Sequence, residues 1–447
     1  MLQSKTVRKY DTYKDSGIEW IGEIPQEWHC INWGLLISLL TDYTANGSFA
    51  DLASNVTYLD DVNYARLIRL TDLRTNLKEK GVYVNEHAYN YLSKSALFGG
   101  ELLLANVGAN AGYVCEMPYV DYKTTLAPNM MLIKFDKDKC NNHFMYYVSQ
   151  CEYIQQQLQL AANKTTAQPK LNKDDVRAIY CLIPSLPEQQ QIADYLDKKC
   201  GEIDRVVETE KAVIEKLKEY KQSIITEAVT KGLDKSAPLK DSGIEWIGKI
   251  PQHWEIGKIK HKFYLSSEEN NDENATLLSL FTHIGVRPRA EMEDKGNKAQ
   301  TVIGYSLVRK GDIIVNKLLA WMGAIGLSDY DGATSPDYDI YRLRDLKNDC
   351  PMFYHYLFRS CNFKDECYKY GRGIMLMRLR TYPEEFLNIY IPKVSKEEQK
   401  QIVEYLDKKC SEIDKAIADK EQVIEKFTEY KKSLIYECVT GKRKVVE

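Results

Sequence analysis

Two long stretches of the chain, residues 188–232 and 397–442, carry apolar residues at spacings of three, four or seven, with Lys, Glu and Asp between them. Such a pattern, sustained for about five heptads, predicts coiled-coil helices. The apolar positions are Ile192, Leu196, Ile203, Val207, Ile214, Leu217, Ile224 and Ala228, then Ile402, Leu406, Ile413, Ile417, Ile424, Phe427, Leu434 and Cys438. Each stripe has to be buried, either on its own domain or on the other helix. Matching length and phase favour the second arrangement, so we expect an antiparallel pair related by a pseudo-two-fold axis.

Shorter strings are also repeated. "DSGIEWIGEIPQEW" at 15–28 returns as "DSGIEWIGKIPQHW" at 241–254, and we call these two strings the headers. The long stretches share "YLDKKC" at 195–200 and 405–410. Each half of the chain therefore consists of a header, a divergent middle and a long helix. An internal repeat of this kind predicts two copies of one architecture.

The divergent middles still share an order of elements. Residues 99–117 and 310–330 each predict a turn, a buried strand and a loop with Gly, Ala and Asn. "ARLIRLTDL" at 65–73 and "TVIGYSLV" at 301–308 predict further strands. We expect two similar α/β domains of about 150 residues, each with a mixed sheet. The predicted division is 1–186 for the first header and domain, 187–232 for the first helix, 233–394 for the linker, second header and second domain, and 395–447 for the second helix and tail.

Charge and cysteine content narrow the class of protein. The formal net charge of the 447 residues is −3, so a DNA-binding surface on this chain has to be local, with acidic residues elsewhere. Eleven cysteines without a CxxC pair indicate reduced, mostly buried thiols in a cytoplasm. The N-terminal segment lacks the apolar core of a signal peptide, and the apolar run at 31–40 is too short for a transmembrane helix.

Catalytic motifs are scarce. The chain has no phosphate-binding glycine loop, no tetrapeptide for methylating an amino group, and no histidine spacing typical of a metal site. Asp337, Asp345 and Lys347 match the letters of a metal-dependent nuclease motif, although the gap between the two acids is short. A stand-alone nuclease is therefore an alternative hypothesis, and a scaffold that joins proteins and ignores DNA is another. Missing chemistry in both halves favours a doubled binding protein.

Basic and amide residues cluster beside the predicted loops. Lys and Arg neutralise phosphates, whereas Arg, Asn and Gln can form paired hydrogen bonds with base edges in the major groove. We therefore predict DNA-binding residues in both middles. In the first they are Asn106, Asn110, Lys123, Thr124, Thr125, Lys164, Thr165, Gln168 and Lys170; in the second they are Arg287, Arg289, Asn316, Lys317, Trp321, Tyr338, Arg372, Arg378 and Arg380.

The headers, the strings "GGELLLANVG" and "KGDIIVNK", and "IPSLPEQQQIADYLDKKCGEID" together resemble the specificity subunit of type I restriction-modification systems. The resemblance covers both halves. It implies two target recognition domains joined by an antiparallel two-helix coiled coil, which bind an asymmetric, split site on double-stranded DNA.

The resemblance also implies partners. Two modification subunits would dock on the helices and methylate adenine with S-adenosylmethionine. Two restriction subunits would hydrolyse ATP and cut the DNA. S-adenosylmethionine, ATP and Mg²⁺ would belong to these partner subunits, and the chain itself would carry no catalytic residue, metal or cofactor.

Overall fold

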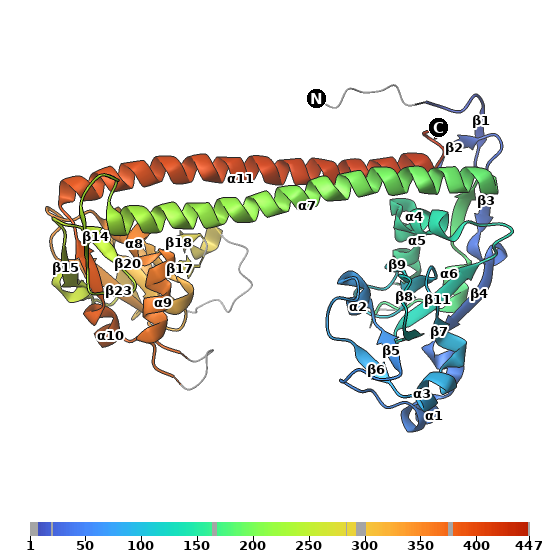
Figure 1. The fold of residues 1–447 in the computed structure, drawn as a ribbon, viewed down its shortest axis with the longest axis horizontal. Coiled ribbons are helices and arrows are strands. Elements are labelled where there is room, and N and C mark those ends of the chain that lie inside the picture. Colours follow the sequence, from blue (N-terminus) through green and yellow to red (C-terminus); the bar gives the residue numbers. More distant parts are fainter. Residues whose placement is uncertain are drawn as a thin grey trace. The chain divides into compact units, whose positions relative to one another are not determined.

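The computed structural model describes residues 8–18, 21–162, 168–282, 284–291, 301–373 and 379–445 (Figure 1). The chain forms two compact units. Unit 1 comprises Met1–Thr209 with Val423–Glu447, and unit 2 comprises Glu210–Gln422. The boundary between the units therefore passes through both long helices, whereas the division predicted from sequence kept each helix whole. Each unit is described by itself below.

The predicted long helices are α7 (Leu186–Lys231) and α11 (Lys396–Val439). Proline is tolerated in a first helical turn, where its missing N–H has no helical partner. Pro187 stands at that position of α7. Gly232, with a φ of +73°, follows α7 directly, in the left-handed conformation that ends many helices. No helix in the described part of the chain is both long and apolar enough to cross a membrane.

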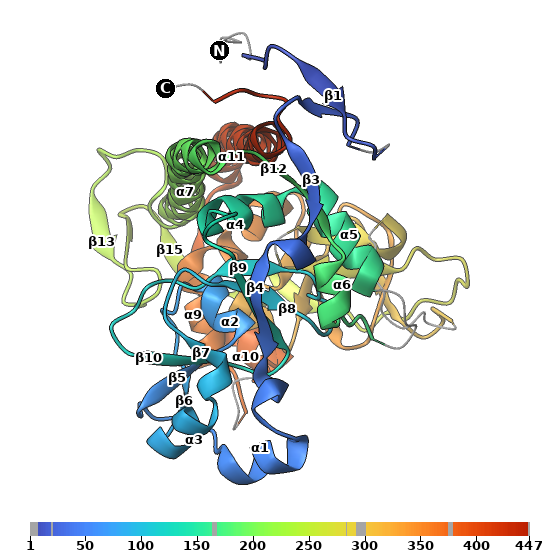
Figure 2. The same ribbon diagram turned by 90° about the vertical axis from the view of Figure 1, so that its right-hand side faces the viewer.

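Both units pair an early part of one long helix with a late part of the other. In unit 1, Leu196 of α7 shares a core with Leu434 of α11, and Asp204 Oδ1 lies 2.7 Å from Lys431 Nζ. In unit 2 the equivalent ion pair joins Lys221 Nζ to Asp414 Oδ2 at 2.6 Å. Residue numbers rise along one helix as they fall along the other, so the pairing is antiparallel, as predicted. Figure 2 shows the two helices side by side.

Unit 1 has two four-stranded sheets. The first has the order β4-β11-β8-β9 and is antiparallel; the second has the order β6-β5-β10-β7 and contains the parallel pair β5–β10. The bounds are β4 (Ile37–Asp42), β5 (Ala65–Ile68), β6 (Val82–Val84), β7 (Ala96–Leu97), β8 (Leu102–Ala105), β9 (Val114–Glu116), β10 (Lys123–Leu126) and β11 (Met130–Phe135). The mixed sheet predicted for each middle is thus present in unit 1. Figure 2 shows α4 (Asn142–Gln150) between the paired helices and β9.

Of the remaining helices of unit 1, α5 is the longest and the others are short. These remaining helices are α1 (Phe49–Asn55), α2 (Leu70–Arg74), α3 (Glu86–Tyr91), α5 (Glu152–Ala162) and α6 (Lys173–Arg177).

Unit 2 repeats the first of these sheets. Its strands run β16-β23-β20-β21, all antiparallel. The bounds are β16 (Phe263–Leu265), β20 (Ile313–Asn316), β21 (Ile325–Leu327) and β23 (Tyr338–Leu343), with separate pairs β17 (Leu278–Phe281)–β18 (Gly285–Pro288) and β19 (Ser306–Val308)–β22 (Gly332–Thr334). Helices α8 (Pro351–Phe358), α9 (Cys361–Lys369) and α10 (Pro383–Asn388) complete the domain. The two units therefore share this antiparallel sheet, whereas the mixed sheet predicted for the second middle is not found among the described strands of unit 2.

The matched turns of the two middles have matched conformations. Gly100 and Gly311 have φ values of +77° and +94°, a region that glycine enters without steric cost. The next residue accepts backbone N–H groups in both cases: Glu101 from Phe98 and Asp312 from Arg309. The strands that follow, β8 and β20, are buried almost throughout. The sequence prediction of a turn and a buried strand is confirmed in each unit.

The predicted strand at 65–73 is correct only for its first half. Strand β5 ends at Ile68 and helix α2 starts at Leu70. The buried Asp72 carboxylate explains the change, because it accepts hydrogen bonds from the guanidinium groups of Arg66 and Arg69 and from the backbone N–H of Arg69. This local network stabilises a helical turn against the β-forming tendency of the sequence.

The headers fold into short hairpins. The first contains β1 (Tyr13–Asp15) and β2 (Glu23–Pro25), and the second contains β13 (Leu239–Asp241) and β14 (Lys249–Pro251). Tryptophans at the ends of the two headers, Trp28 and Trp254, are buried. Beside each hairpin a further strand pair closes the domain: β3 (His29–Asn32) with β12 (Tyr180–Ile183), and β15 (Glu255–Lys258) with β24 (Tyr390–Lys393). Repeated sequence has thus become repeated structure.

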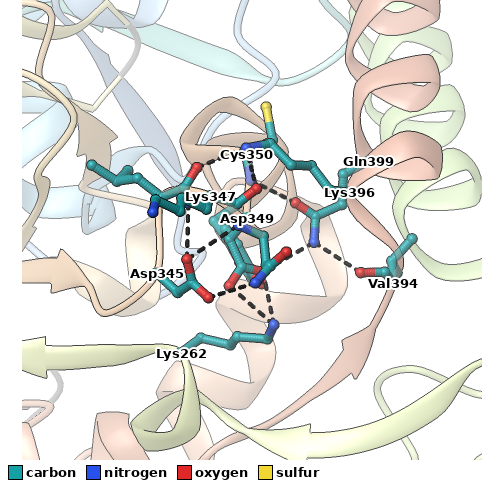
Figure 3. A network of polar contacts seen from close by, with 11 residues as sticks. Lys262, Asp345, Lys347, Asp349, Cys350, Val394, Lys396 and Gln399 are labelled. Carbon is teal, nitrogen blue, oxygen red and sulfur yellow. Dashed lines mark hydrogen bonds and ion pairs between the residues drawn. The ribbon is translucent and has the colours of Figure 1, made fainter.

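A buried glutamine attaches each domain to its long helix. In unit 2, Gln399 of α11 accepts a hydrogen bond from the backbone N–H of Cys350 at 2.7 Å and donates to Val394 O at 3.0 Å and Asp349 Oδ1 at 3.2 Å (Figure 3). In unit 1, Gln189 of α7 accepts from the backbone N–H of Asn141 at 2.8 Å. The two glutamines are the same residue of the sequence repeat and play the same structural role.

Candidate nucleic-acid interface

Each unit joins two loops by backbone hydrogen bonds at the end of its central strand. In unit 1, the N–H of Leu171 donates to Asn106 O at 2.8 Å, and the N–H of Gly108 donates to Pro169 O at 2.9 Å. In unit 2, the N–H of Thr381 donates to Lys317 O at 3.0 Å. Asn106 and Lys317 therefore occupy equivalent positions. We call the paired loops loop surface 1 (residues 106–112 and 168–171) and loop surface 2 (316–319, 371–373 and 379–381).

Loop surface 1 presents amides and the ammonium group of Lys170. Gln168 and Lys170 are exposed. Asn110 is also exposed, and its Oδ1 accepts a hydrogen bond of 2.7 Å from an Arg74 guanidinium nitrogen. That guanidinium also lies 5.1 Å from the ring centre of Tyr113, a cation–π contact. Arg74 adds a positive charge that sequence reasoning missed, because it lies at the end of a helix that was expected to be a strand.

Loop surface 2 is richer in charge. Arg372 and Arg380 are exposed and exchange two backbone hydrogen bonds of 2.8 and 3.0 Å, so their side chains lie on neighbouring backbones. The Arg372 guanidinium also pairs with Glu385. Lys317 Nζ lies 3.2 Å from Asp339 Oδ1 and donates to Pro336 O. Burial raises the pKa of Asp339, while the ammonium group of Lys317 opposes that rise.

Several predicted residues of unit 2 lie in or near this surface. Asn316 ends β20 and accepts the backbone N–H of Leu318 at 3.0 Å. Tyr338 begins β23, the strand paired with that end of β20. The indole N–H of Trp321 donates to Leu318 O, and its ring meets Tyr368 edge to face. Asn316 and Trp321 therefore help to hold the loop.

Other predicted residues lie elsewhere. Lys123 begins β10, in the second sheet of unit 1, and its ammonium group stacks 4.3 Å above the ring centre of Tyr64. Arg287 lies within β18 and donates to the neighbouring carbonyl of Val286, and Arg289 directly follows that strand. These three cations form separate patches on their units.

Thr124 and Thr125 are buried, with exposures of 1% and 0%. Their hydroxyls donate to carbonyl oxygens inside the sheet, Thr124 to Leu97 O at 3.0 Å and Thr125 to Ser95 O at 3.3 Å. A buried hydroxyl that is hydrogen-bonded to a backbone carbonyl cannot contact a phosphate. We therefore remove Thr124 and Thr125 from the predicted DNA-binding residues. Lys164, Thr165 and Arg378, which were also predicted, lie outside the described residues.

The nuclease hypothesis fails on distance. Asp337 precedes β23 and Asp345 follows it, so a six-residue strand separates them. Such a strand is roughly 20 Å long, whereas carboxylates that share a divalent cation lie within about 5 Å of each other. Asp345 instead accepts hydrogen bonds from Lys347 N and Asn348 N, and Lys347 O accepts from Lys396 Nζ of α11 (Figure 3). These residues connect the domain to the helix.

Metal-ligating side chains do not gather elsewhere among the residues the structure describes: no group of three His, Cys, Asp or Glu side chains is arranged to hold an ion. The eleven cysteines, all within the described ranges, are free thiols, and most are buried. Burial raises the pKa of Cys140 to about 12 and of Cys200 to about 11, which makes both poor nucleophiles.

Comparison with known proteins shows what the chain is similar to. Residues 61–219 match the family model of the type I restriction modification DNA specificity domain. Two curated proteins of Methanocaldococcus jannaschii are similar over nearly their whole length. The type I restriction enzyme MjaVIII specificity subunit is 25% identical over 94% of each chain. The putative type I restriction enzyme MjaX specificity subunit is 22% identical over 95% of this chain and 96% of its own.

A solved structure has the same fold. A chain from a study of complex assembly and conformational transition of the type I R-M system aligns over 93% of this chain and 98% of its own, at 14% identity and a TM-score of 0.66. Together with the repeated header, sheet and helix, these likenesses make the chain similar, over nearly its whole length, to type I restriction-modification specificity subunits.

Proposed function

We propose that each unit reads one half of an asymmetric, bipartite site on duplex DNA, through loop surface 1 in unit 1 and loop surface 2 in unit 2. One observation carries the proposal: both surfaces use the same backbone frame but present different side chains. Asn106 stands where Lys317 stands, and Lys170 occupies the place of Arg380. A common frame with different donors and acceptors is what two unrelated half-sites require.

The polar side chains of the two loop surfaces would serve two purposes. Lys170, Arg372 and Arg380 are exposed cations that can neutralise phosphates and position the unit on the duplex. Asn110, Gln168 and Asn316 carry amides that can pair with base edges. The formal charge of the whole chain is −3, so binding depends on these local cations rather than on a general attraction.

The chain directs chemistry that its partners perform. In this proposal, modification subunits bind S-adenosylmethionine and methylate adenine, and restriction subunits use ATP and Mg²⁺ to cut DNA in host defence. The chain contributes recognition and assembly and carries no catalytic residue or cofactor. It acts in the cytoplasm, where free thiols such as those of its eleven cysteines stay reduced.

The direct test is single-molecule sequencing of DNA from cells that carry the system, scored for methyladenine. The expected result is one bipartite motif that disappears when the chain is deleted. Methylation that persists without the chain, or cleavage of DNA by the purified chain with Mg²⁺ alone, would contradict the proposal. Binding to DNA without sequence preference or salt dependence would instead favour a scaffold.

The helices offer a surface for two copies of one partner. Tyr195 and Tyr430 of unit 1 both lie near the ammonium group of Lys199, and in unit 2 Tyr405 and Tyr220 lie near Lys409. We call these sets twin patch 1 (Tyr195, Lys199, Glu202 and Tyr430) and twin patch 2 (Tyr405, Lys409, Glu412 and Tyr220). Each residue of one patch is the sequence repeat of a residue of the other.

Packing explains why buried repeated residues are alike, but it does not explain identity on the surface. Tyr220 is 56% exposed, and Tyr405 and Tyr430 are each 37% exposed. Tyrosine is enriched at protein interfaces because it combines a large apolar ring with a polar end. Two equal, tyrosine-centred patches are suited to two copies of one protein, and we assign them to the two modification subunits.

This assignment predicts a change of stoichiometry. The pair Tyr195→Ala and Tyr430→Ala removes twin patch 1 alone, so native mass spectrometry should find one modification subunit instead of two. The pair Tyr220→Ala and Tyr405→Ala should do the same. Tyr436→Ala is the control, because Tyr436 is 38% exposed on α11 but its repeat partner is Thr226. Two bound subunits in either double variant, or loss of a subunit in the control, would refute the assignment.

A further inference from the structure

A cavity of about 620 Å³ opens in unit 1 beside loop surface 1. Its walls come from α1, from the loop after β8 and from the segment before α6, and they include the predicted DNA-binding residues Asn106 and Lys170. The volume lies within the range of pockets that hold small organic ligands. Recognition of DNA by loop surface 1 does not itself require a cavity beside that surface.

The lining of the cavity is mostly apolar, with aromatic rings at the rim. Phe49 is 81% exposed and Tyr58 is 51% exposed, although both belong to the cavity wall. Leu52 and Met130 lie deeper and are buried. Two exposed rings in the wall of a mostly apolar cavity offer surfaces on which a flat, aromatic ligand can stack.

One polar atom in the wall lacks a partner. The side-chain oxygen of Asn106 is buried and accepts no hydrogen bond from the part of the chain that the structure describes. An unsatisfied buried acceptor costs stability, so its retention indicates that a donor arrives from outside. The terminal torsion of an asparagine side chain is soft, and a small rotation presents this amide to the cavity. An amide both accepts and donates, which matches the polar edge of a nucleobase.

In unit 2, an ion pair occupies the place that corresponds to this cavity. Lys317 is the counterpart of Asn106, and Asp339 is the counterpart of Met131, because both stand opposite the second-last residue of the central strand. Their side chains form the 3.2 Å ion pair described above, so charge occupies the place of the apolar wall. The stacking site is therefore a property of unit 1.

We propose that the cavity accepts one base of the bound DNA, unstacked from the duplex, so that unit 1 reads this base by stacking on Phe49 and Tyr58 and by a hydrogen bond to Asn106. This inference rests on the proposed DNA-reading function. The base is distinct from the adenine that a partner methylates. Removing a base from the stack exposes its pairing edge, which lets a pocket discriminate all four bases.

The test uses the full chain assembled with its modification subunits and duplexes that contain the methylated motif found by sequencing. The fluorescent analogue 2-aminopurine replaces bases at and beside each position in turn. We expect a severalfold rise in fluorescence at one position of the half-site read by unit 1, apart from the methylated adenine. Phe49→Ala should abolish this rise and leave the signal at the methylated adenine intact.

Asn106→Leu separates a binding role from a structural one. Leucine has a similar shape and removes the unsatisfied oxygen, so the thermal midpoint should stay equal or rise, while affinity for the motif should fall about tenfold. Phe98→Ala is the matched control, because Phe98 is 67% exposed in unit 1 but lies outside this cavity.

Specific binding with no fluorescent position beyond the methylated adenine would overturn the inference and leave the proposed function standing. Loss of specific binding by the wild-type chain would remove both. Saturable binding of free adenosine or guanosine at the cavity without DNA, abolished by Phe49→Ala, would overturn the inference in favour of a small-molecule site.

Discussion

At the scale of single residues, a histidine connects the first domain to its long helix. His143 of α4 lies 2.8 Å from Glu116 Oε2 and 2.6 Å from Asp197 Oδ1 of α7, and its ring stacks on Tyr146. Hydrogen bonds to Glu116, opposed by partial burial and supported by Asp197, raise the pKa of His143 to about 9. The imidazolium form is therefore part of the folded structure at neutral pH.

His143→Gln should destabilise the chain in a pH-dependent way. Because the folded pKa lies above the ordinary 6.5, the proton contributes its full stability below pH 6.5 and loses it as the pH rises through about 9. The ring is 33% exposed, so we expect a loss of only about 1 kcal/mol at pH 6.5. Urea denaturation at pH 6.5 and pH 9.5 measures both values. His29→Gln, on an exposed histidine of β3, is the control, and an equal loss at both pH values would contradict the role.

Exposed and buried members of the predicted DNA-binding set should respond differently to substitution: the exposed ones through DNA affinity and the buried ones through stability. Lys170→Ala and Arg380→Ala each remove an exposed cation, so each should weaken binding uniformly across sequences and reduce the salt slope by about one unit. Thr124→Val removes a buried hydroxyl, so it should cost about 1 kcal/mol of stability and leave DNA affinity unchanged. Titrations of labelled duplex at several salt concentrations test all three. Weakened DNA binding by a folded Thr124→Val chain would be inconsistent with the burial.

At the scale of elements, the long helices were predictable because their apolar residues recur at regular spacing over many turns. A single position that departs from this pattern does not change the prediction. The start of α11 was predictable to within a residue, at 395 against Lys396. Short elements were harder. Helix α2 replaced part of a predicted strand because Asp72 binds two arginines, a contact that depends on side-chain geometry rather than on periodicity.

A buried glutamine contributes to the attachment of each domain to its helix. Replacing Gln399 by Leu leaves the backbone N–H of Cys350, Val394 O and Asp349 without this partner, so we expect a loss of about 1–3 kcal/mol. Gln189→Leu should cost a similar amount in unit 1. Hydrogen exchange should rise in the altered unit and stay unchanged in the other unit. Gln191→Leu is the control, since Gln191 is exposed. A uniform rise in both units would contradict local attachment.

At the scale of the whole molecule, duplication decides what kind of protein this is. A repeated frame, repeated helices and repeated surface tyrosines are combined with loop surfaces that differ between units. Repetition is retained where the two halves share a packing problem and where, in the proposed function, they would bind the same partner. Divergence is found where each half would meet a different stretch of DNA.

The helices connect the two units, so their length should set the gap between half-sites. Four residues inserted after Thr209 and four after Asp419 lengthen both helices by one turn, about 6 Å, which exceeds the 3.4 Å rise of a base pair. We expect both half-sites to persist and the gap between them to change, as read by methyladenine sequencing. Substituting four residues at each place without insertion is the control. An unchanged gap in a folded, methylating complex would refute this ruler role.

The sequence by itself determined the repeat, the two long helices, the central strands and the family resemblance, because these are properties of periodicity and identity along the chain. Only the tertiary structure decided which polar residues face solvent. Thr124 and Thr125 are of a residue type that is usually exposed, yet both lie inside a sheet. Asp337 and Asp345 are near each other in the sequence, yet they lie beyond opposite ends of β23. The cavity beside Asn106 is likewise invisible to sequence, since it forms from segments distant along the chain. Local pattern fixes local elements, whereas exposure and proximity depend on how those elements pack.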